Sequence, residues 1–309
     1  MGIIKPKILV IIFLFLSHLL AMAQEMEFEE NSDGIVLLEN GEPRYFYRTS
    51  PVDTVSPFAR TNYIHPLYGL GGEILTEDFP MDHPHHHGIF WAWHQLYAKG
   101  KRIADPWLNQ GIKWKIRETE TEVNNSEAIL SSQVLWLLEA TSEAVIREDL
   151  QISFDRIGEN IFSLNFRIKL TALVEGIAIG GSEDAKGYGG FSARLKLPED
   201  VMFSSVKGEV EPMNLPVQAG PWVNISGHFD PSSNESSAIV IMGDPENLPS
   251  YQGWILRSAS SMQNLAFPGK NPVPIEKGES LSFRNQLLIH RSLSKTEIAQ
   301  FYRQFKKVQ

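Results

Sequence analysis

Apolar and polar residues alternate with a period of two along most of the chain, which is the pattern of strands with one buried face. Clusters of Asn, Gly, Pro or Ser separate these segments and mark turns. Asn40-Gly41 is a strong hairpin signal, so the chain is expected to open with a β-hairpin. The predicted strands are Gly34–Glu39, Pro43–Tyr47, Ile112–Arg117, Glu127–Glu139, Ala144–Phe154, Ile161–Leu170, Phe191–Leu197, Ser237–Met242, Tyr251–Arg257 and Ser280–Ile289.

One segment has helical spacing. Lys295–Lys306 follows Ser294, a favoured N-cap residue, and its apolar side chains recur on one helix face. Many strands at short spacing and one terminal helix predict an all-β fold, an antiparallel β-sandwich. The sequence lacks both βαβ alternation and a glycine-rich phosphate loop, which disfavours nucleotide cofactors.

The N-terminus has the features of a secretory signal peptide over residues 1–23. Lys5 and Lys7 precede the apolar run Ile8–Leu20, and Ala21-Met22-Ala23 is a small-x-small cleavage site. The alternative is an uncleaved anchor. We expect cleavage, a periplasmic or secreted protein, no stable membrane insertion afterwards, and a single β-sandwich catalytic domain over residues 24–309.

Composition narrows the function classes. The 309 residues are 42% hydrophobic and 21% charged, which is typical of a globular protein. The formal net charge of −9 argues against nucleic acid as a partner. The absence of Cys excludes disulfides, so stability must come from a large core. The acidic segment Gln24–Asp33 is predicted to be a solvated lead-in.

Six of the nine histidines lie between Arg60 and Trp107. Histidine changes charge near neutral pH and is the commonest transition-metal ligand, so this concentration predicts a site. If the run is extended, His83, His85 and His87 project to one face and His86 to the other.

Three interpretations of these histidines stay open: acid/base catalysis, metal binding and a structural role. Catalysis would draw on a charged neighbour such as Glu73, Asp82 or Arg194. A metal site would use His83, His85 and His87, completed by His65 or His94. The sequence assigns no cofactor and leaves a divalent metal open.

The run Asp82–His86 with its Gly88–Trp91 continuation resembles the hallmark of a secreted bacterial family labelled methane-oxygenase-related, or PmoA-like. The similarity extends roughly from Tyr45 to Ser292, with one departure at His87, where an Arg is expected. Further blocks similar to that family are Gly189–Arg194, Gly220–Val223, Asp244–Asn247 and Trp254.

The methane-oxygenase label does not transfer, because that subunit is a membrane protein and the mature chain has no span of about twenty apolar residues. The resemblance implies instead a secreted protein of polysaccharide-degrading systems with a galactose-mutarotase-like sandwich. It further implies an oligosaccharide dehydratase of ulvan breakdown, which removes water from a terminal uronic acid to leave an unsaturated sugar.

Such chemistry needs a cation for the uronate, a base, an acid and an aromatic wall. Candidate acid/base residues are His65, His83, His86 and Tyr188. Candidate substrate-binding residues are Arg194, Arg257, Trp91, Trp93, Trp222 and His94.

Two other functions stay open beside the dehydratase. A glycoside hydrolase would need two carboxyl groups in one pocket. A non-catalytic sugar-binding protein would depend on the tryptophans rather than the histidines. Candidate carboxyl groups for the hydrolase are Glu73, Asp78, Asp82, Glu183 and Asp184.

Overall fold

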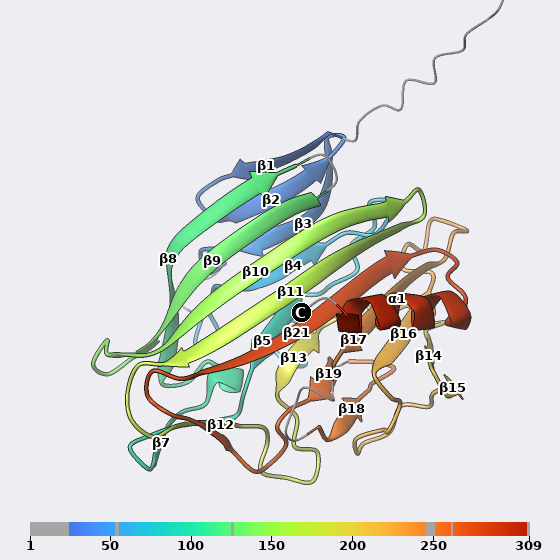
Figure 1. Cartoon of the computed structure of the whole chain (residues 1–309). Helices are drawn as coiled ribbons and strands as arrows, with labels where there is room; N and C mark the ends of the chain where they lie inside the picture. The colour runs from blue at the N-terminus through green and yellow to red at the C-terminus, as the bar shows by residue number, and fades with distance from the viewer. Residues whose placement is uncertain (1–24, 53–55, 125–126, 245–250, 261, 308–309) are drawn as a thin grey trace, which may run out of the picture.

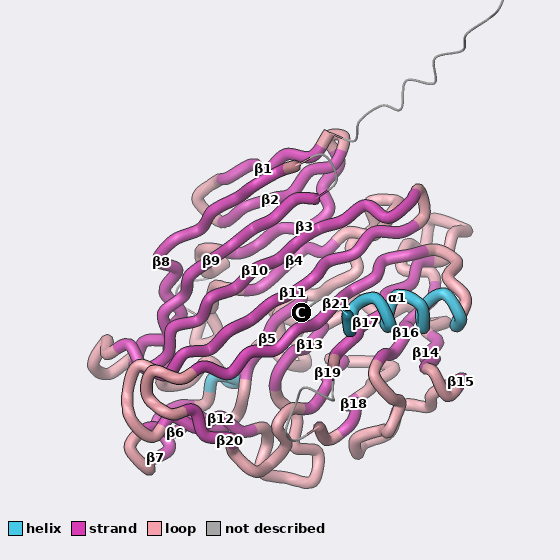
Figure 2. Tube along the Cα trace, in the orientation of Figure 1, coloured by secondary structure: helices cyan, strands magenta, loops and turns pink. Residues whose placement is uncertain are grey.

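The computed structural model describes residues 25–52, 56–124, 127–244, 251–260 and 262–307 (Figure 1). The predicted signal peptide lies outside these residues. Among the described residues, no helix is long and apolar enough to cross a membrane. Strands dominate, all paired neighbours are antiparallel, and a C-terminal helix lies against one sheet (Figure 2). The predicted antiparallel β-sandwich with one C-terminal helix is therefore confirmed.

Two large sheets form the sandwich. The eight-stranded sheet contains, in spatial order, β1 (Met26–Glu30), β2 (Gly34–Glu39), β3 (Glu42–Arg48), β4 (Tyr63–Leu67), β5 (Ile89–Ala92), β13 (Gly190–Ala193), β19 (Gln263–Ala266) and β18 (Gly253–Ile255). The nine-stranded sheet contains β15 (Gly208–Glu209), β14 (Met202–Ser205), β16 (Trp222–Gly227), β17 (Ser237–Gly243), β21 (Ser280–His290), β11 (Ile161–Ala172), β10 (Ala144–Gly158), β9 (Glu127–Leu138) and β8 (Ile112–Val123).

A smaller sheet and two helices complete the fold of the residues that the structure describes. The four-stranded sheet contains β20 (Val273–Ile275), β12 (Ile177–Gly180), β6 (Gln95–Ala98) and β7 (Lys101–Ala104). The short 3-10 helix η1 spans Pro106–Leu108, and α1 spans Lys295–Lys307. The acidic segment predicted to be a lead-in is instead largely strand, because β1 pairs with β2 at the edge of the eight-stranded sheet.

Period-two alternation places the main core between the two large sheets. On β9 every second residue is buried, and Trp136 among them packs against Trp93 with ring centroids 6.1 Å apart. Trp91 reaches Phe166 of β11 at 6.3 Å. Apolar side chains of both sheets therefore fill one layer, and burial of this area is the main stabilising contribution.

Helix α1 covers part of the outer face of the nine-stranded sheet (Figure 1). Ser294 and Glu297 form a capping box at its start, with the Glu297 N–H donating to Ser294 Oγ and the Ser294 N–H donating to Glu297. Ile298 and Phe305 pack on Trp222, so this tryptophan lies beneath the helix.

A second, smaller apolar cluster lies on the outer face of the eight-stranded sheet. On β5 the side chains of Phe90 and Ala92 point away from the main core, opposite to Trp91. Trp107 of η1 joins the same cluster, together with Tyr63, Ile255, Met262 and Ala266. The histidine-rich segment lies over this cluster, since His86 packs on both Phe90 and Trp107.

Candidate functional site

The histidine-rich segment is a pair of turns and not a strand. The His83 N–H donates to the Pro80 carbonyl at 3.1 Å, and the His86 N–H donates to the His83 carbonyl at 2.9 Å. The imidazoles of His83 and His86 therefore stack with centroids 4.7 Å apart, and His85 meets His86 edge-on at 4.7 Å. The run is therefore not extended, so His83, His85 and His87 do not share one face. The turns after Pro80 and His83 group His83, His85 and His86 and direct His87 elsewhere.

His87 is a structural residue. It is fully buried, its Nδ1 lies 2.7 Å from Asp78 Oδ1, and its Nε2 lies 3.4 Å from Asn109 Nδ2. Both ring nitrogens are thus occupied, and the predicted metal set of His83, His85 and His87 does not form. Within the described part of the chain, no group of three His, Cys, Asp or Glu side chains is placed to hold a metal ion.

A cavity of about 210 Å³ opens beside the stacked histidines. The volume of this cavity matches one sugar ring. Its walls come from three loops that lie far apart in the sequence. These are the histidine turns, the loop between β12 and β13, and the loop between β18 and β19. The cavity is lined by His83, His85, His86, Lys186, Tyr188, Ile255, Arg257, Ala259, Ser260 and Met262.

His83 is oriented by a carboxylate. Its Nδ1 lies 2.7 Å from Asp82 Oδ2, which favours the tautomer with a proton on Nδ1 and a free Nε2. Asp82 also accepts two hydrogen bonds from Arg194, at 3.1 and 2.8 Å. Desolvation raises the pKa of Asp82, but the hydrogen bonds from Arg194 and His83 outweigh it and hold that pKa well below its usual range.

Arg194 does not face the cavity. Its side chain is 4% exposed, and its Nε donates to Glu77 at 2.8 Å while its other nitrogens bind Asp82. The prediction that Arg194 contacts substrate is wrong, because two carboxylates already occupy its guanidinium. Arg194 instead holds Asp82, which in turn orients His83.

Two cations line the cavity, and no carboxylate is among its described lining residues. Arg257 donates to the carbonyl oxygens of Met213, Leu256 and Asn214, so its charge is fixed in place without a carboxylate among these partners. Lys186 lies 3.3 Å from the exposed carboxylate of Asp184. The cavity therefore favours an anionic ligand. The sequence prediction included Arg257 but missed Lys186. Only its proximity to Tyr188 in the sequence could have indicated that Lys186 belongs to the site.

The buried His86 and the half-buried His85 are neutral at pH 7. Burial lowers the pKa of His86 to about 2, helped by the nearby charges of His85, His83 and Arg194. Burial likewise lowers the pKa of His85 to about 4, with His83 as the next contributor. His86 Nδ1 is buried with no hydrogen-bond partner among the described residues. Neutral imidazoles can accept protons, and a bound anion would raise their pKa values.

Tyr188 forms part of the wall of the cavity. Its ring lies 4.9 Å from both Trp107 and His94, and His94 is held by Asp105 at 3.1 Å. Desolvation raises the pKa of Tyr188, as do Asp184 and Asp105, so the phenol keeps its proton at neutral pH. His94 supports Tyr188 from behind and is not a lining residue. Its predicted role in substrate contact is therefore not realised, since Tyr188 and Trp107 cover its ring.

His65 is not brought to the cavity. It lies on β4 with its Nδ1 2.9 Å from Thr76 Oγ1, and it is absent from the described cavity lining. Burial lowers its pKa to about 4. The prediction of His65 as a catalytic partner of His83 and His86 is therefore wrong in this geometry.

The predicted tryptophan wall is also wrong. The indole N–H of Trp91 donates to Glu148 at 2.8 Å, and that of Trp93 donates to the Phe267 carbonyl at 2.9 Å, both inside the core. Trp222 is 1% exposed beneath α1. Strand parity explains the error, because alternate residues of one strand face opposite sides of the sheet. Trp107, which the sequence prediction missed, lies next to the cavity on the correct side.

The carboxyl pair required for a glycoside hydrolase is not assembled here. Each candidate carboxyl group already has a protein partner, and none is among the described lining residues of the cavity. The partners are Ser237 for Glu73, His87 and Tyr63 for Asp78, Arg194 and His83 for Asp82, Arg102 for Glu183, and Ser182 and Lys186 for Asp184.

Fold and cavity together define an antiparallel β-sandwich protein with a histidine-lined, cationic pocket. The chain belongs to a family of unknown function, DUF6807, whose model matches residues 34–303. That description assigns no activity, so neither the methane-oxygenase label nor the dehydratase follows from membership. A comparison with curated proteins found no match.

Solved structures give distant likenesses. A heparan sulfate lyase from Pedobacter heparinus is 8% identical with a TM-score of 0.41, over 87% of this chain and 35% of the lyase. An alpha-galactosidase from Lactobacillus brevis is 11% identical with a TM-score of 0.36, over 90% and 41% of the two chains. An aldose epimerase homologue from C. elegans is 6% identical with a TM-score of 0.35, over 87% and 98%.

This chain thus spans about a third of the lyase and less than half of the galactosidase. At such identities and TM-scores the likenesses carry no argument about activity or about a particular sandwich family. The mutarotase-like expectation stays a prediction.

Proposed function

We propose that this protein is a carbohydrate-active enzyme, a dehydratase that removes water from the uronic acid at the non-reducing end of an oligosaccharide, with ulvan-type fragments as its substrates. One observation carries the proposal. A ring-sized cavity joins an aspartate-oriented histidine, a protonated tyrosine and two cations, with no carboxylate among its described lining residues. These are the groups that elimination next to a carboxylate requires.

Arg257 and Lys186 hold the uronate carboxylate in this scheme. Neutralising that charge lowers the barrier to removing the proton on the adjacent carbon, C5. His83 then takes the C5 proton on Nε2, and Asp82 stabilises the imidazolium that forms, since its hydrogen bond to Nδ1 is already in place.

Tyr188 is the acid. Its phenol donates a proton to the C4 hydroxyl, the C4–O bond breaks, and the electron pair of the former C5–H bond forms the C4=C5 double bond. Water leaves, and transfer of the proton from His83 to the tyrosinate restores both groups. The apolar lining residues Ile255 and Met262, which belong to the same cluster as the neighbouring Trp107, keep this exchange away from bulk water.

The predicted signal peptide over residues 1–23 completes the proposal with a periplasmic or secreted location. Extracellular breakdown products of a polysaccharide would meet the enzyme there. Mass spectrometry of the intact protein recovered from its native host checks this, because cleavage leaves a chain that begins at Gln24. A full-length chain would contradict it.

The activity test mixes the purified mature chain with saturated uronate-terminated oligosaccharides, with and without a chelator. We expect ultraviolet absorbance to rise as the conjugated double bond forms, together with the loss of one water in the mass spectrum. His83→Ala should lower turnover at least 100-fold. The matched control is His228→Ala, since His228 also lies 2.6 Å from an aspartate, Asp200, but at an exposed position away from the cavity.

Each other outcome counts against the dehydratase. A released sugar without absorbance would support the hydrolase, and binding without any product would support a sugar-binding protein. Equal turnover in His83→Ala and His228→Ala would remove His83 from the chemistry. Loss of turnover with chelator would contradict a site built from His83 and Tyr188 alone.

A further inference from the structure

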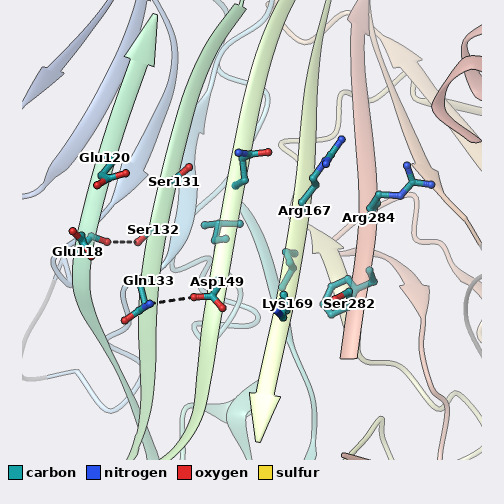
Figure 3. A pocket seen from close by; sticks show the side chains of 14 residues that line it. Glu118, Glu120, Ser131, Ser132, Gln133, Asp149, Arg167, Lys169, Ser282 and Arg284 are labelled. Carbon is teal, nitrogen blue, oxygen red and sulfur yellow. Dashed lines mark hydrogen bonds between the residues drawn. The ribbon is translucent and has the colours of Figure 1, made fainter. Parts of the chain in front are cut away.

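The outer face of the nine-stranded sheet carries a second polar surface, unrelated to the histidine cavity. Its strands present rows of aligned side chains, because cross-strand partners point to the same side. One row is Glu120, Ser131, Gln151, Arg167 and Arg284, and the next is Glu118, Gln133, Asp149, Lys169 and Ser282 (Figure 3).

These rows form the floor of a long groove. One part has a volume of about 490 Å³ and the adjoining part about 450 Å³. Both parts are lined by Gln151, Arg167 and Arg284, so the two volumes are continuous across the arginines. The second part extends to Phe301 and Phe305 of α1, which gives that end an apolar wall.

Two arginines face each other directly at the middle of the groove. Arg167 of β11 and Arg284 of β21 are cross-strand partners, a spacing of about 5 Å between Cβ atoms. Like charges in that position destabilise a sheet. Figure 3 shows both guanidinium groups directed the same way along the sheet.

Only one of these arginines is held by the protein. Arg284 donates to the Phe305 carbonyl at 3.3 Å, lies 3.5 Å from Asp244 and packs over the Phe305 ring. Arg167 is exposed and has no hydrogen bond or ion pair with any residue that the structure describes. Lys169 adds a third cation two residues along β11, opposite Asp149.

We propose that this groove binds an acidic oligosaccharide, with Arg167 and Arg284 forming a clasp for a carboxylate or sulfate group. A pair of planar guanidinium groups suits such an anion, and a bound anion removes the repulsion between them. The remaining lining combines carboxylates with hydroxyl and amide side chains, and the latter match the many donors and acceptors of a sugar chain. The carboxylates are Glu118, Glu120, Glu127, Asp149 and Asp155. The hydroxyl and amide side chains include Ser131, Gln133, Gln151, Ser153, Asn165, Ser282 and Gln286.

The chemistry of the face disfavours a peptide ligand. An extended peptide pairs with an open strand edge through its backbone, whereas the backbone groups of β9, β10, β11 and β21 are already paired on both sides. Carboxylates line both parts of the groove, so its positive charge is concentrated at Arg167, Arg284 and the neighbouring Lys169.

The groove lies across the sandwich from the histidine cavity, since the two sites are on the outer faces of different large sheets. The inference therefore goes beyond the proposed dehydratase. The groove needs no catalytic groups. An oligosaccharide bound there would stay attached to the enzyme between catalytic reactions.

Calorimetric titration of the full mature chain tests the proposal, with a galacturonate hexamer as the acidic probe and a neutral glucose hexamer as its match. The titration uses the His83→Ala background, so that no turnover consumes the probe. We expect the acidic hexamer to bind at least tenfold more tightly, with affinity falling as salt is raised. Arg167→Gln should weaken that binding at least tenfold.

Arg117→Gln is the matched control, because Arg117 is an exposed arginine of the same sheet that does not line the groove. It should change the affinity less than twofold. Equal binding of both hexamers, no binding of either, or equal losses in the two arginine variants would overturn the proposal. None of these outcomes depends on whether the wild-type protein is a dehydratase.

Discussion

Arg194 places both ends of its guanidinium fork on the two carboxylate oxygens of Asp82, at 3.1 and 2.8 Å. Asp82 in turn accepts from His83 at 2.7 Å, so a buried cation fixes the histidine through the carboxylate between them. The Arg194 backbone N–H also donates to the Gly88 carbonyl at 2.7 Å, which attaches the segment that follows β13 to the end of the histidine turns. Arg194 is a positioning residue.

Arg194→Gln should free Asp82 and loosen His83. Because the hydrogen bonds from Arg194 lower the pKa of Asp82, that pKa is expected to rise toward its ordinary value of 3.8. Turnover should fall about 10- to 100-fold, as when the partner of an oriented histidine is removed. Carbon NMR of the Asp82 carboxyl group gives the first quantity and the absorbance assay gives the second.

The control for this variant is Arg147→Gln. Arg147 also pairs with a carboxylate, Asp149 at 3.3 Å, but on the outer face of the nine-stranded sheet. It should leave turnover and the Asp82 titration unchanged. An unaltered Asp82 pKa in Arg194→Gln would show that Arg194 does not act through that carboxylate.

Tyr188→Phe tests the proposed acid. It removes only the hydroxyl and keeps the ring contacts with Trp107 and His94, so the melting temperature should shift by less than about 2 °C. Turnover of the uronate substrate should fall about 100-fold or more. A variant as active as the wild type would exclude the phenol as proton donor and leave that role to a histidine or to water.

Sequence periodicity predicted the long strands well because their alternation is regular. Glu127–Glu139 and Ile161–Leu170 match β9 and β11 to within two residues, and the capped helix ends one residue from its prediction. Short strands were either not predicted or predicted too long. The predicted strand Phe191–Leu197 corresponds to β13, which has only four residues. Four residues carry too little pattern to distinguish a strand from a loop.

The site was predicted only in part, because residue type does not reveal direction. The histidine segment was identified, but two successive turns decide that His86 rather than His87 joins His83. Trp91 has the chemistry of a sugar-binding side chain, yet strand parity directs it to the core. Arg194 has the charge to bind a uronate, and only the tertiary structure shows that Asp82 and Glu77 already neutralise it.

Acid should destabilise the protein below neutral pH. Burial lowers the pKa of His290 to about 4 and that of His86 to about 2, whereas unfolded histidines titrate near 6.5. The unfolded chain therefore binds more protons, and stability that is complete above pH 6.5 is lost as the pH falls toward the folded-state values.

Between pH 7.5 and pH 5 each such histidine should cost about 1–2 kcal/mol of unfolding free energy. Urea titrations at the two pH values measure this decrease in the free energy of unfolding. In His86→Gln the decrease should be smaller by the contribution of one histidine. A loss of the same size in the variant would mean that His86 is protonated in the folded protein at pH 5.

Glu148 is the centre of a buried polar network and the position where one substitution should cost most stability. It is fully buried in the core, and its oxygens accept hydrogen bonds from Asn62 at 2.9 Å and from the indoles of Trp91 and Trp136 at 2.8 Å. Glu148→Ala leaves three buried donors without an acceptor, with an expected cost of about 3–5 kcal/mol in the free energy of unfolding.

Asp149→Ala is the neighbouring control. Asp149 faces the solvent side of β10, where Gln133 donates to it at 3.2 Å and Arg147 at 3.3 Å, and exposed pairs of this kind contribute about 0–1 kcal/mol. Chemical unfolding of both variants at pH 7 should therefore separate them by at least about 2 kcal/mol, the difference between those two ranges. Equal losses would mean that the three donors find new acceptors when the carboxylate is removed, so that the network is not the rigid support of Trp91 that its geometry indicates.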